Sequence, residues 1–137
     1  MIKVNCSKTI LHLTPHVGGG VGAVLADLVM ALKDNDCFHT HKIACLDNCH
    51  EFSRKRFQRL NVDFKEGLAY NKHLLTKNII DSADLVIVHY WNHPLLTNML
   101  VNQDIGLARF LVWCHGSGLN EPSVIPNYLF DLSEKLI

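Results

Sequence analysis

Short apolar runs alternate with stretches of helical period along the chain. The run Leu85-Val86-Ile87-Val88 is continuous and rich in β-branched residues, which is typical of a strand covered on both faces. Apolar residues recur at steps of three and four from Val21 to Leu32, which predicts a helix over Val21–Lys33 with one buried stripe. The other predicted helices are Glu51–Leu60, Lys72–Ser82, Pro94–Val101 and Asn127–Asp131. The predicted strands are Thr9–Leu13, Lys42–Leu46, Val62–Lys65, Leu85–His89 and Phe110–Cys114, and Glu134–Ile137 is predicted to approach a further strand.

This alternation of strands and helices predicts the fold class. Strand, helix and strand in succession favour right-handed crossovers and helices on both faces of one sheet. The predicted fold is therefore α/β, a single domain with a doubly wound, mostly parallel, Rossmann-like sheet. Of the 137 residues, 48% are apolar and 19% are charged, a composition that excludes a disordered chain.

Charge and cysteine content narrow the setting in which the protein works. Lysine plus arginine and aspartate plus glutamate number 13 each, so no overall field attracts nucleic acid. The five cysteines form no C-x-x-C pair and no secretory signal precedes them, which predicts a cytoplasmic protein. No apolar stretch approaches the ~20 residues that span a bilayer. One basic cluster, formed by Arg54, Lys55, Arg56 and Arg59, is either a solvated helix face or a peripheral contact with acidic lipid headgroups at the inner membrane face.

Three polar loops follow predicted strands. They are Thr14–Gly22, His89–Pro94 and His115–Glu121. In an open parallel sheet, ligands bind beyond the carboxyl ends of the strands, where the strand order reverses. We therefore expect the three loops to meet at one cleft.

The first of these loops is rich in glycine. Without β-carbons its backbone can approach a ligand closely, and free N–H groups at the start of the next helix favour a phosphate or another anion. The alternative is that Gly18, Gly19, Gly20 and Gly22 only form a tight turn between a strand and a helix.

Histidine titrates near neutral pH, so it can donate or accept a proton with little tuning, but most of the nine histidines need no such role. His89, His93 and His115 stand out because they fall at predicted strand ends, whereas His12, His39, His41, His50 and His73 are expected to be structural or solvated. Zinc held by His89 and His93, or by Cys45, Cys49 and His50, is disfavoured because the spacings match no known ligand pattern. The sequence therefore predicts no metal site. Gly116-Ser117-Gly118 also lacks the G-x-S-x-G pattern of a serine nucleophile.

Taken together, the loops resemble a known family. A first strand that ends in a Gly-Gly-Gly loop, an Asp-Leu-Val-Ile-Val-His strand followed by Trp and His-Pro, and a fifth strand that ends in Cys-His-Gly resemble the N-terminal domain of family-four GT-B glycosyltransferases. The resemblance extends from Thr9 to Ile137. It implies that residues 1–137 form the acceptor-side, Rossmann-like domain and that the C-terminal nucleotide-sugar-binding domain is missing, so that this chain alone is inactive.

The same resemblance implies roles for individual residues. Gly19 and Gly20 would lie near the diphosphate and the sugar of the donor, and His115 would be catalytic by contacting the sugar. His89 and Trp91 would line the acceptor side. The implied reaction is retaining transfer of a sugar from a nucleotide-diphosphate sugar to a glycan or lipid-linked acceptor, as in polysaccharide biosynthesis, without a cofactor.

Two other functions remain open on the sequence. Gly18, Gly20 and Ala23 satisfy G-x-G-x-x-A, and Asp47 ends the second predicted strand, as in an NAD(P)-binding module of an oxidoreductase. Thr14–Val17 lies between the strand and the glycines, which weakens that match. The third possibility is a non-catalytic interaction domain with this fold, because a fold does not fix a function.

Overall fold

Strands and helices alternate through the computed structural model, which describes residues 7–35, 39–71, 74–102, 108–115, 125–132 and 135–136. The strands are β1 (Thr9–Thr14), β2 (Thr40–Cys45), β3 (Asp63–Lys65), β4 (Leu85–Tyr90), β5 (Phe110–Cys114) and β6 (Lys135–Leu136). The helices are α1 (Gly19–Asn35), α2 (Glu51–Arg59), α3 (Leu74–Asp81), α4 (Pro94–Asn102) and α5 (Tyr128–Leu132). Each predicted element is present, so the sequence-based assignment is confirmed.

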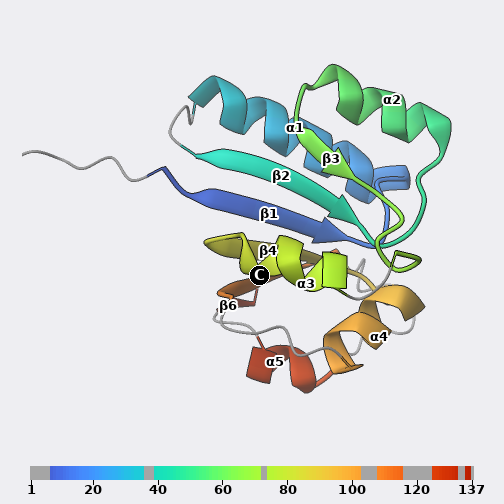
Figure 1. The fold of residues 1–137 in the computed structure, drawn as a ribbon, viewed down its shortest axis with the longest axis vertical. Coiled ribbons are helices and arrows are strands. Elements are labelled where there is room, and N and C mark those ends of the chain that lie inside the picture. Colours follow the sequence, from blue (N-terminus) through green and yellow to red (C-terminus); the bar gives the residue numbers. More distant parts are fainter. Residues whose placement is uncertain are drawn as a thin grey trace, which may run out of the picture.

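The strands form one sheet in the order β3-β2-β1-β4-β5-β6, and each neighbouring pair is parallel (Figure 1). The chain builds outward from β1 to β3 in one direction and then from β4 to β6 in the other. The order therefore reverses between β1 and β4, which are hydrogen-bonded neighbours. This Rossmann-like topology confirms the predicted α/β fold and places the expected binding edge beyond the carboxyl ends of β1 and β4.

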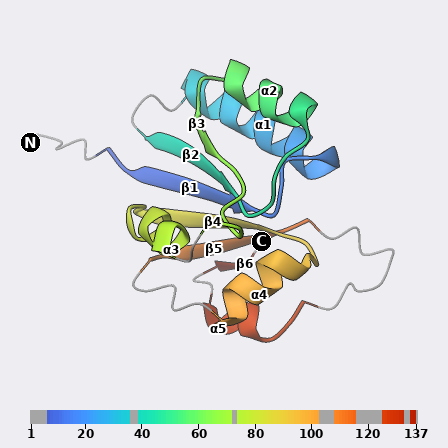
Figure 2. The same cartoon turned by 45° about the vertical axis from the view of Figure 1, so that its right-hand side comes forward.

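Helices cover both faces of the sheet (Figures 1 and 2). Helices α1 and α2 pack on the face of β2, where Leu25, Val29 and Phe57 join Ile43 in one buried cluster. Helices α3, α4 and α5 pack on the opposite face, in a second cluster that also contains side chains of β1, β4 and β5. The repeated apolar positions seen in the sequence are thus the residues that join helices to the sheet.

Strand alternation decides which residues face α1. Leu11 and Leu13 belong to the cluster under α3 and α4, so His12 between them points to the opposite face. By the same alternation, His89 of β4 points to the α1 face, because Val88 belongs to the cluster on the other side. His12 and His89 therefore lie on the same face of the sheet, and both are completely buried.

No helix in the described part of the chain has both the length and the apolar character needed to cross a membrane.

Candidate functional site

The loop between β1 and α1 lies at the edge where the strand order reverses. Its path is fixed by local hydrogen bonds: the Thr14 hydroxyl donates to the carbonyl of His16 at 3.0 Å, and the N–H of Gly18 donates to Nδ1 of the same histidine at 3.1 Å. The N–H of Leu46 donates to the carbonyl of Thr14 at 3.0 Å, which ties the loop to the end of β2. His16 is therefore held in place at the edge.

The glycines of this loop differ in whether the structure requires a glycine at their position. Gly22 packs so closely on the loop that an added β-carbon would lie 2.0 Å from the carbonyl oxygen of Val17. Gly19 has a φ of +63°, a conformation that favours glycine. A β-carbon on Gly19 or Gly20 would meet no described atom within 4 Å, and both residues are exposed. The tight-turn explanation thus accounts for Gly22, whereas the two glycines predicted to lie near the donor face open space.

An aromatic cluster joins the β1 loop to the loop after β4. The ring of His16 meets Trp91 edge-on, with 5.3 Å between centroids, and meets His93 at 5.7 Å. Trp91 and His93 are 6.2 Å apart, and all three side chains are half-buried. His93 also caps α4, because its Nδ1 accepts from the N–H of Leu95 at 3.3 Å. Burial, followed by the proximity of His16, lowers the pKa of His93. The cluster therefore places two imidazoles beside an indole ring at the edge of the sheet.

A carboxylate lies at the end of β2 near this cluster. Oδ1 of Asp47 accepts from the Tyr70 hydroxyl at 2.8 Å and from the N–H of Asn48 at 2.8 Å. The hydrogen bond from Tyr70 lowers the pKa of Asp47, and the nearby His93 and His16 act in the same direction. The same bond raises the pKa of Tyr70. The edge thus carries one fixed negative charge facing two imidazoles.

His115 directly follows β5 and is half-buried at the same edge. Its backbone N–H donates to the carbonyl of Tyr90 at 2.8 Å, so it lies next to the residue that precedes Trp91. Its Nε2 is 2.9 Å from Nδ1 of His89, and its ring stacks on Trp113 with 5.3 Å between centroids. Burial lowers the pKa of His115. The structure therefore brings the segments of Gly20, Trp91 and His115 to one edge of the sheet.

His89, expected to line the acceptor side, has no exposed surface in the chain. It lies beneath His115 and contacts the ring of Trp113 at 5.6 Å between centroids. Burial, and then the neighbouring His12 and His115, lowers its pKa to about 3. Any link between His89 and a ligand at the edge therefore passes through His115.

Two histidines that the sequence placed among ordinary elements take part in the same arrangement. Nδ1 of His12 is 3.1 Å from Nε2 of His89, and Nε2 of His12 is 3.1 Å from Nδ1 of His41. The sequence carried a signal for His12, because a polar residue between Leu11 and Leu13 in a buried strand requires a partner. His41 gave no such signal, since its strand begins at an exposed threonine.

The cysteines weighed as zinc ligands form a different kind of contact. Cys45 and Cys49 are buried and hydrogen-bonded to each other, which raises the pKa of Cys45 and lowers that of Cys49. The N–H of Cys49 donates to Glu66 at 2.9 Å, and Glu66 is paired with Arg54 at 2.6 Å. Within the described ranges, no group of three or more His, Cys, Asp or Glu side chains is arranged to hold a metal ion.

Three members of the basic cluster on α2 have acidic partners. Arg54 pairs with Glu66. Lys55 pairs with Glu51 at 2.6 Å, and Arg56 approaches Asp27 at 3.7 Å. These contacts offset much of the positive charge that a peripheral lipid contact would use.

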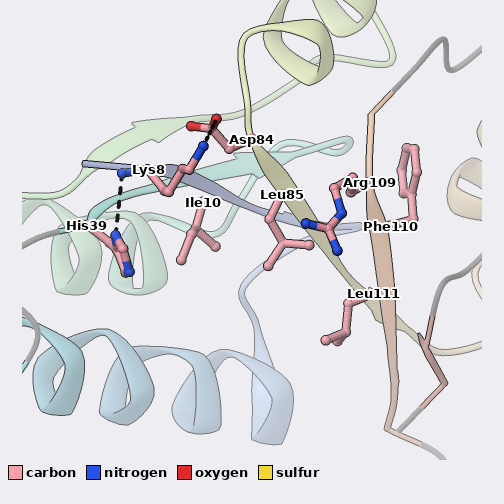
Figure 3. Close-up of a pocket in the computed structure, with 8 residues that line it drawn as sticks. All are labelled: Lys8, Ile10, His39, Asp84, Leu85, Arg109, Phe110 and Leu111. Carbon is pink, nitrogen blue, oxygen red and sulfur yellow. Dashed lines mark hydrogen bonds and ion pairs between the residues drawn. The ribbon is translucent and has the colours of Figure 1, made fainter. Parts of the chain in front are cut away.

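A large open pocket lies at the opposite edge of the sheet, near the amino ends of β1, β4 and β5 (Figure 3). Its volume is about 610 Å³. Its lining residues are Lys8, Ile10, His39, Asp84, Leu85, Arg109, Phe110 and Leu111. Lys8 is paired with Asp84 at 3.2 Å, so its charge is already engaged. Because open α/β sheets bind ligands at the carboxyl ends of their strands, we place the functional site at the edge of His16, Trp91 and His115 rather than here.

Comparisons with known proteins do not identify a family. No protein-family model matches the sequence, and no curated protein matches it. The fold itself is defined by strand order and crossovers: the chain is a single-domain α/β protein with a parallel, Rossmann-like sheet.

Proposed function

We propose that this chain is the N-terminal, acceptor-side domain of a GT-B glycosyltransferase that resembles family four. It would transfer a sugar from a nucleotide-diphosphate donor to a glycan or lipid-linked acceptor with retention of configuration. The observation that supports this proposal best is that His16, Trp91 and His115, which follow β1, β4 and β5, lie at the edge where the strand order reverses. The rest of the third predicted loop, 116–121, lies outside the described residues.

The aromatic cluster has the chemistry of a sugar-binding surface. An indole ring gives an apolar platform for the C–H face of a sugar, and the nearby imidazoles supply hydrogen bonds for hydroxyl groups. Trp91 is half-buried and its ring is held edge-on by His16 and His93. This preorganised orientation reduces the entropy lost when a ligand binds.

The start of α1 fits the diphosphate of the donor. The first N–H groups of a helix have no partner within the helix and favour an anion. Gly19 and Gly20 occupy the first two positions of this 17-residue helix, and the described atoms leave open space beside both. A phosphate can therefore approach the backbone there without meeting a side chain.

The position of His115 supports a role in stabilising the transition state. His115 lies at the edge, and burial keeps its imidazole uncharged at neutral pH, so that it can donate one hydrogen bond to a sugar hydroxyl or oxyanion. The nucleotide, and the Arg, Lys and Glu residues that bind the donor in the family, belong to the second domain. Catalysis requires both domains, because together they position the donor and the acceptor, and this positioning supplies several kcal/mol of the barrier reduction.

One prediction tests His115 in the enzyme that joins this chain to its second domain. His115→Ala is expected to lower kcat at least tenfold, roughly 1.4 kcal/mol of transition-state stabilisation. His39→Ala is the matched control, because His39 is an exposed histidine beside the pocket at the opposite edge. Steady-state kinetics, with thermal unfolding of each variant, give the result. Unchanged turnover in His115→Ala would remove this residue from the mechanism.

The alternative is an NAD(P)-binding module, and Asp47 is the observation in its favour. This carboxylate lies at the end of β2, where an acidic residue meets a ribose hydroxyl in dinucleotide-binding folds. Two observations weigh against it. Pro15–Gly18 separates β1 from α1, and Oδ1 of Asp47 already accepts two hydrogen bonds.

Ligand titration of this chain separates the two functions. The chain has two tryptophans, so in a Trp113→Phe background the fluorescence reports Trp91 alone. A nucleotide-diphosphate sugar or a sugar 1-phosphate is expected to change the emission, because the sugar packs on the indole ring. NAD is expected to leave it unchanged. A saturable response to NAD with none to any sugar ligand would contradict the transferase proposal and favour the dinucleotide module.

A further inference from the structure

Four histidines form one continuous series across the sheet. In order they are His41 of β2, His12 of β1, His89 of β4 and His115 after β5, and we call them the histidine row. The three ring-nitrogen distances along the row are 3.1, 3.1 and 2.9 Å. Adjacent rings lie 5.1 to 5.4 Å apart between centroids. These are hydrogen-bond distances, so each ring is linked to the next.

The three contacts of the row all have the same orientation. At each of its three contacts, Nδ1 of one histidine meets Nε2 of the next, from His41 through His12 and His89 to His115. Both ring nitrogens of His12 and of His89 are used within the row. Nε2 of His41 and Nδ1 of His115 are the remaining nitrogens, one at each end.

The interior of the row is uncharged. His12 and His89 are completely buried, and burial, followed by the neighbouring histidines, lowers the pKa of each to about 3. A neutral imidazole has one N–H group and one lone pair. A hydrogen bond between two rings needs one N–H group opposite one lone pair. All three contacts of the row meet this condition only if every ring is protonated on Nδ1 or every ring is protonated on Nε2.

Two arrangements satisfy this condition. In the first, each ring is protonated on Nδ1, and His115 presents an N–H group at the edge. In the second, each ring is protonated on Nε2, and His115 presents a lone pair there. The tautomers of His41 and His115 are thus coupled through two buried rings, although the two residues do not touch each other within the row.

We propose that the histidine row is a proton relay that connects the ligand edge at His115 with His41 on the other side of β1. In the forward direction, a basic oxygen of a ligand takes the proton from Nδ1 of His115. Nε2 of His115 then takes the proton of His89, His89 takes that of His12, and His12 takes that of His41. Nε2 of His41 is buried, although the side chain as a whole is only half-buried, so it takes its proton from water or a buffer acid when this side chain moves outwards. Four rings then change tautomer and one proton crosses the sheet.

This transfer leaves no lasting charge on the buried rings, which is the physical advantage of a row over a single buried acid. A buried imidazolium would be costly because burial disfavours the charged form. Proton transfer along the row does not depend on sugar transfer. It applies to any ligand that gains or loses a proton at the edge.

The tautomer of each imidazole can be measured by ¹⁵N NMR in the unmodified chain. We expect the four histidines to share one tautomer, or to exchange between the two as a group. The finding of opposite tautomers in two neighbours, such as Nε2–H in His12 with Nδ1–H in His89, would overturn the relay, because their contact would then hold no proton.

A matched pair of variants tests coupling over the full length of the row, with the signal read at His41. His115→Phe removes the terminal ring nitrogens, whereas Trp113→Phe changes the aromatic packing against His115 and His89 but removes no ring nitrogen of the row. His115→Phe is expected to change the Nδ1–H to Nε2–H ratio of His41 at least roughly threefold, the size expected for loss of one hydrogen bond. Trp113→Phe is expected to leave that ratio unchanged. Equal responses in the two variants would contradict the relay.

If His115→Phe does not fold, a second variant tests the same coupling. His12→Phe interrupts the row in its middle and keeps an aromatic ring of similar shape. It is expected to change the tautomer ratio at His115, which His12 does not contact within the row. An unchanged ratio in a folded His12→Phe chain would overturn the proposal.

Discussion

At pH 4 the chain is expected to be much less stable towards unfolding than at pH 7, because two completely buried histidines resist protonation. Burial lowers the pKa of His12 and of His89 from 6.5 to about 3. In the unfolded chain both imidazoles bind protons below pH 6.5. Between about pH 6 and pH 3.5 the unfolded state therefore binds more protons, and the free energy of unfolding falls as the pH falls.

The size of this effect follows from the two shifts. Each histidine contributes at most about 1.4 kcal/mol per pH unit, so the pair lowers the free energy of unfolding by at most about 3 kcal/mol per unit. Over two to three such units the loss is roughly 5–8 kcal/mol, which equals the whole stability of a domain in the lower part of the usual range of roughly 5–15 kcal/mol. This stability is fully present above pH 6.5 and is lost as the pH falls towards 3.

Urea unfolding at pH 7, 6 and 5, followed by circular dichroism, measures this slope. The double variant His12→Phe with His89→Phe is expected to show a much shallower dependence on pH, whatever its stability at pH 7. His39→Phe is the control, since this histidine is exposed. A double variant with the slope of the unmodified chain would show that other groups cause the acid sensitivity.

Gly22→Ala is expected to lower the free energy of unfolding by about 3 kcal/mol or more, at the severe end of overpacking effects. The new β-carbon would lie 2.0 Å from the carbonyl oxygen of Val17 and 2.5 Å from its carbonyl carbon. Val17 is 3% exposed and packs with the helices on its side of the sheet, so its backbone has little room to move. The start of α1 would therefore have to separate from the loop.

Gly20→Ala is the matched control, two positions earlier in the same helix. Its β-carbon would meet nothing within 4 Å, and alanine favours a helix over glycine by roughly 0.5–1 kcal/mol. This variant is expected to be as stable as the unmodified chain or slightly more so. Urea unfolding at pH 7 compares the two variants, and equal stabilities would contradict the close packing at Gly22.

Most of the fold was predictable because its signals are local. Phe110–Cys114 was predicted with the bounds observed, and α1 differs from its prediction by two residues at each end. Parallel pairing was predictable too, because a continuous apolar run such as that of β4 needs cover on both faces. The need for glycine at position 22 was not predictable, because the sequence does not show that the carbonyl group of Val17 lies where a β-carbon would be.

The candidate site was predictable in outline only. That loops after β1, β4 and β5 share an edge follows from parallel strands, so Trp91 and His115 were found from position alone. His16 was passed over although it lies in the glycine loop, because its contact with Trp91 joins two loops 75 positions apart. Tyr70 was missed for the same reason, since its partner Asp47 lies 23 residues away.

The amino-acid sequence is enough to predict the alternation of strands and helices, the apolar positions that join them and the residues available at the strand ends. It does not reveal that His41, His12, His89 and His115 lie in one row, which depends on the tertiary structure. Their contacts depend on the order β2-β1-β4-β5 and on strand register, which sets each histidine diagonally beside the next on the same face. Periodicity along a chain fixes which face a side chain takes, but which strand lies beside it is settled by packing between distant segments.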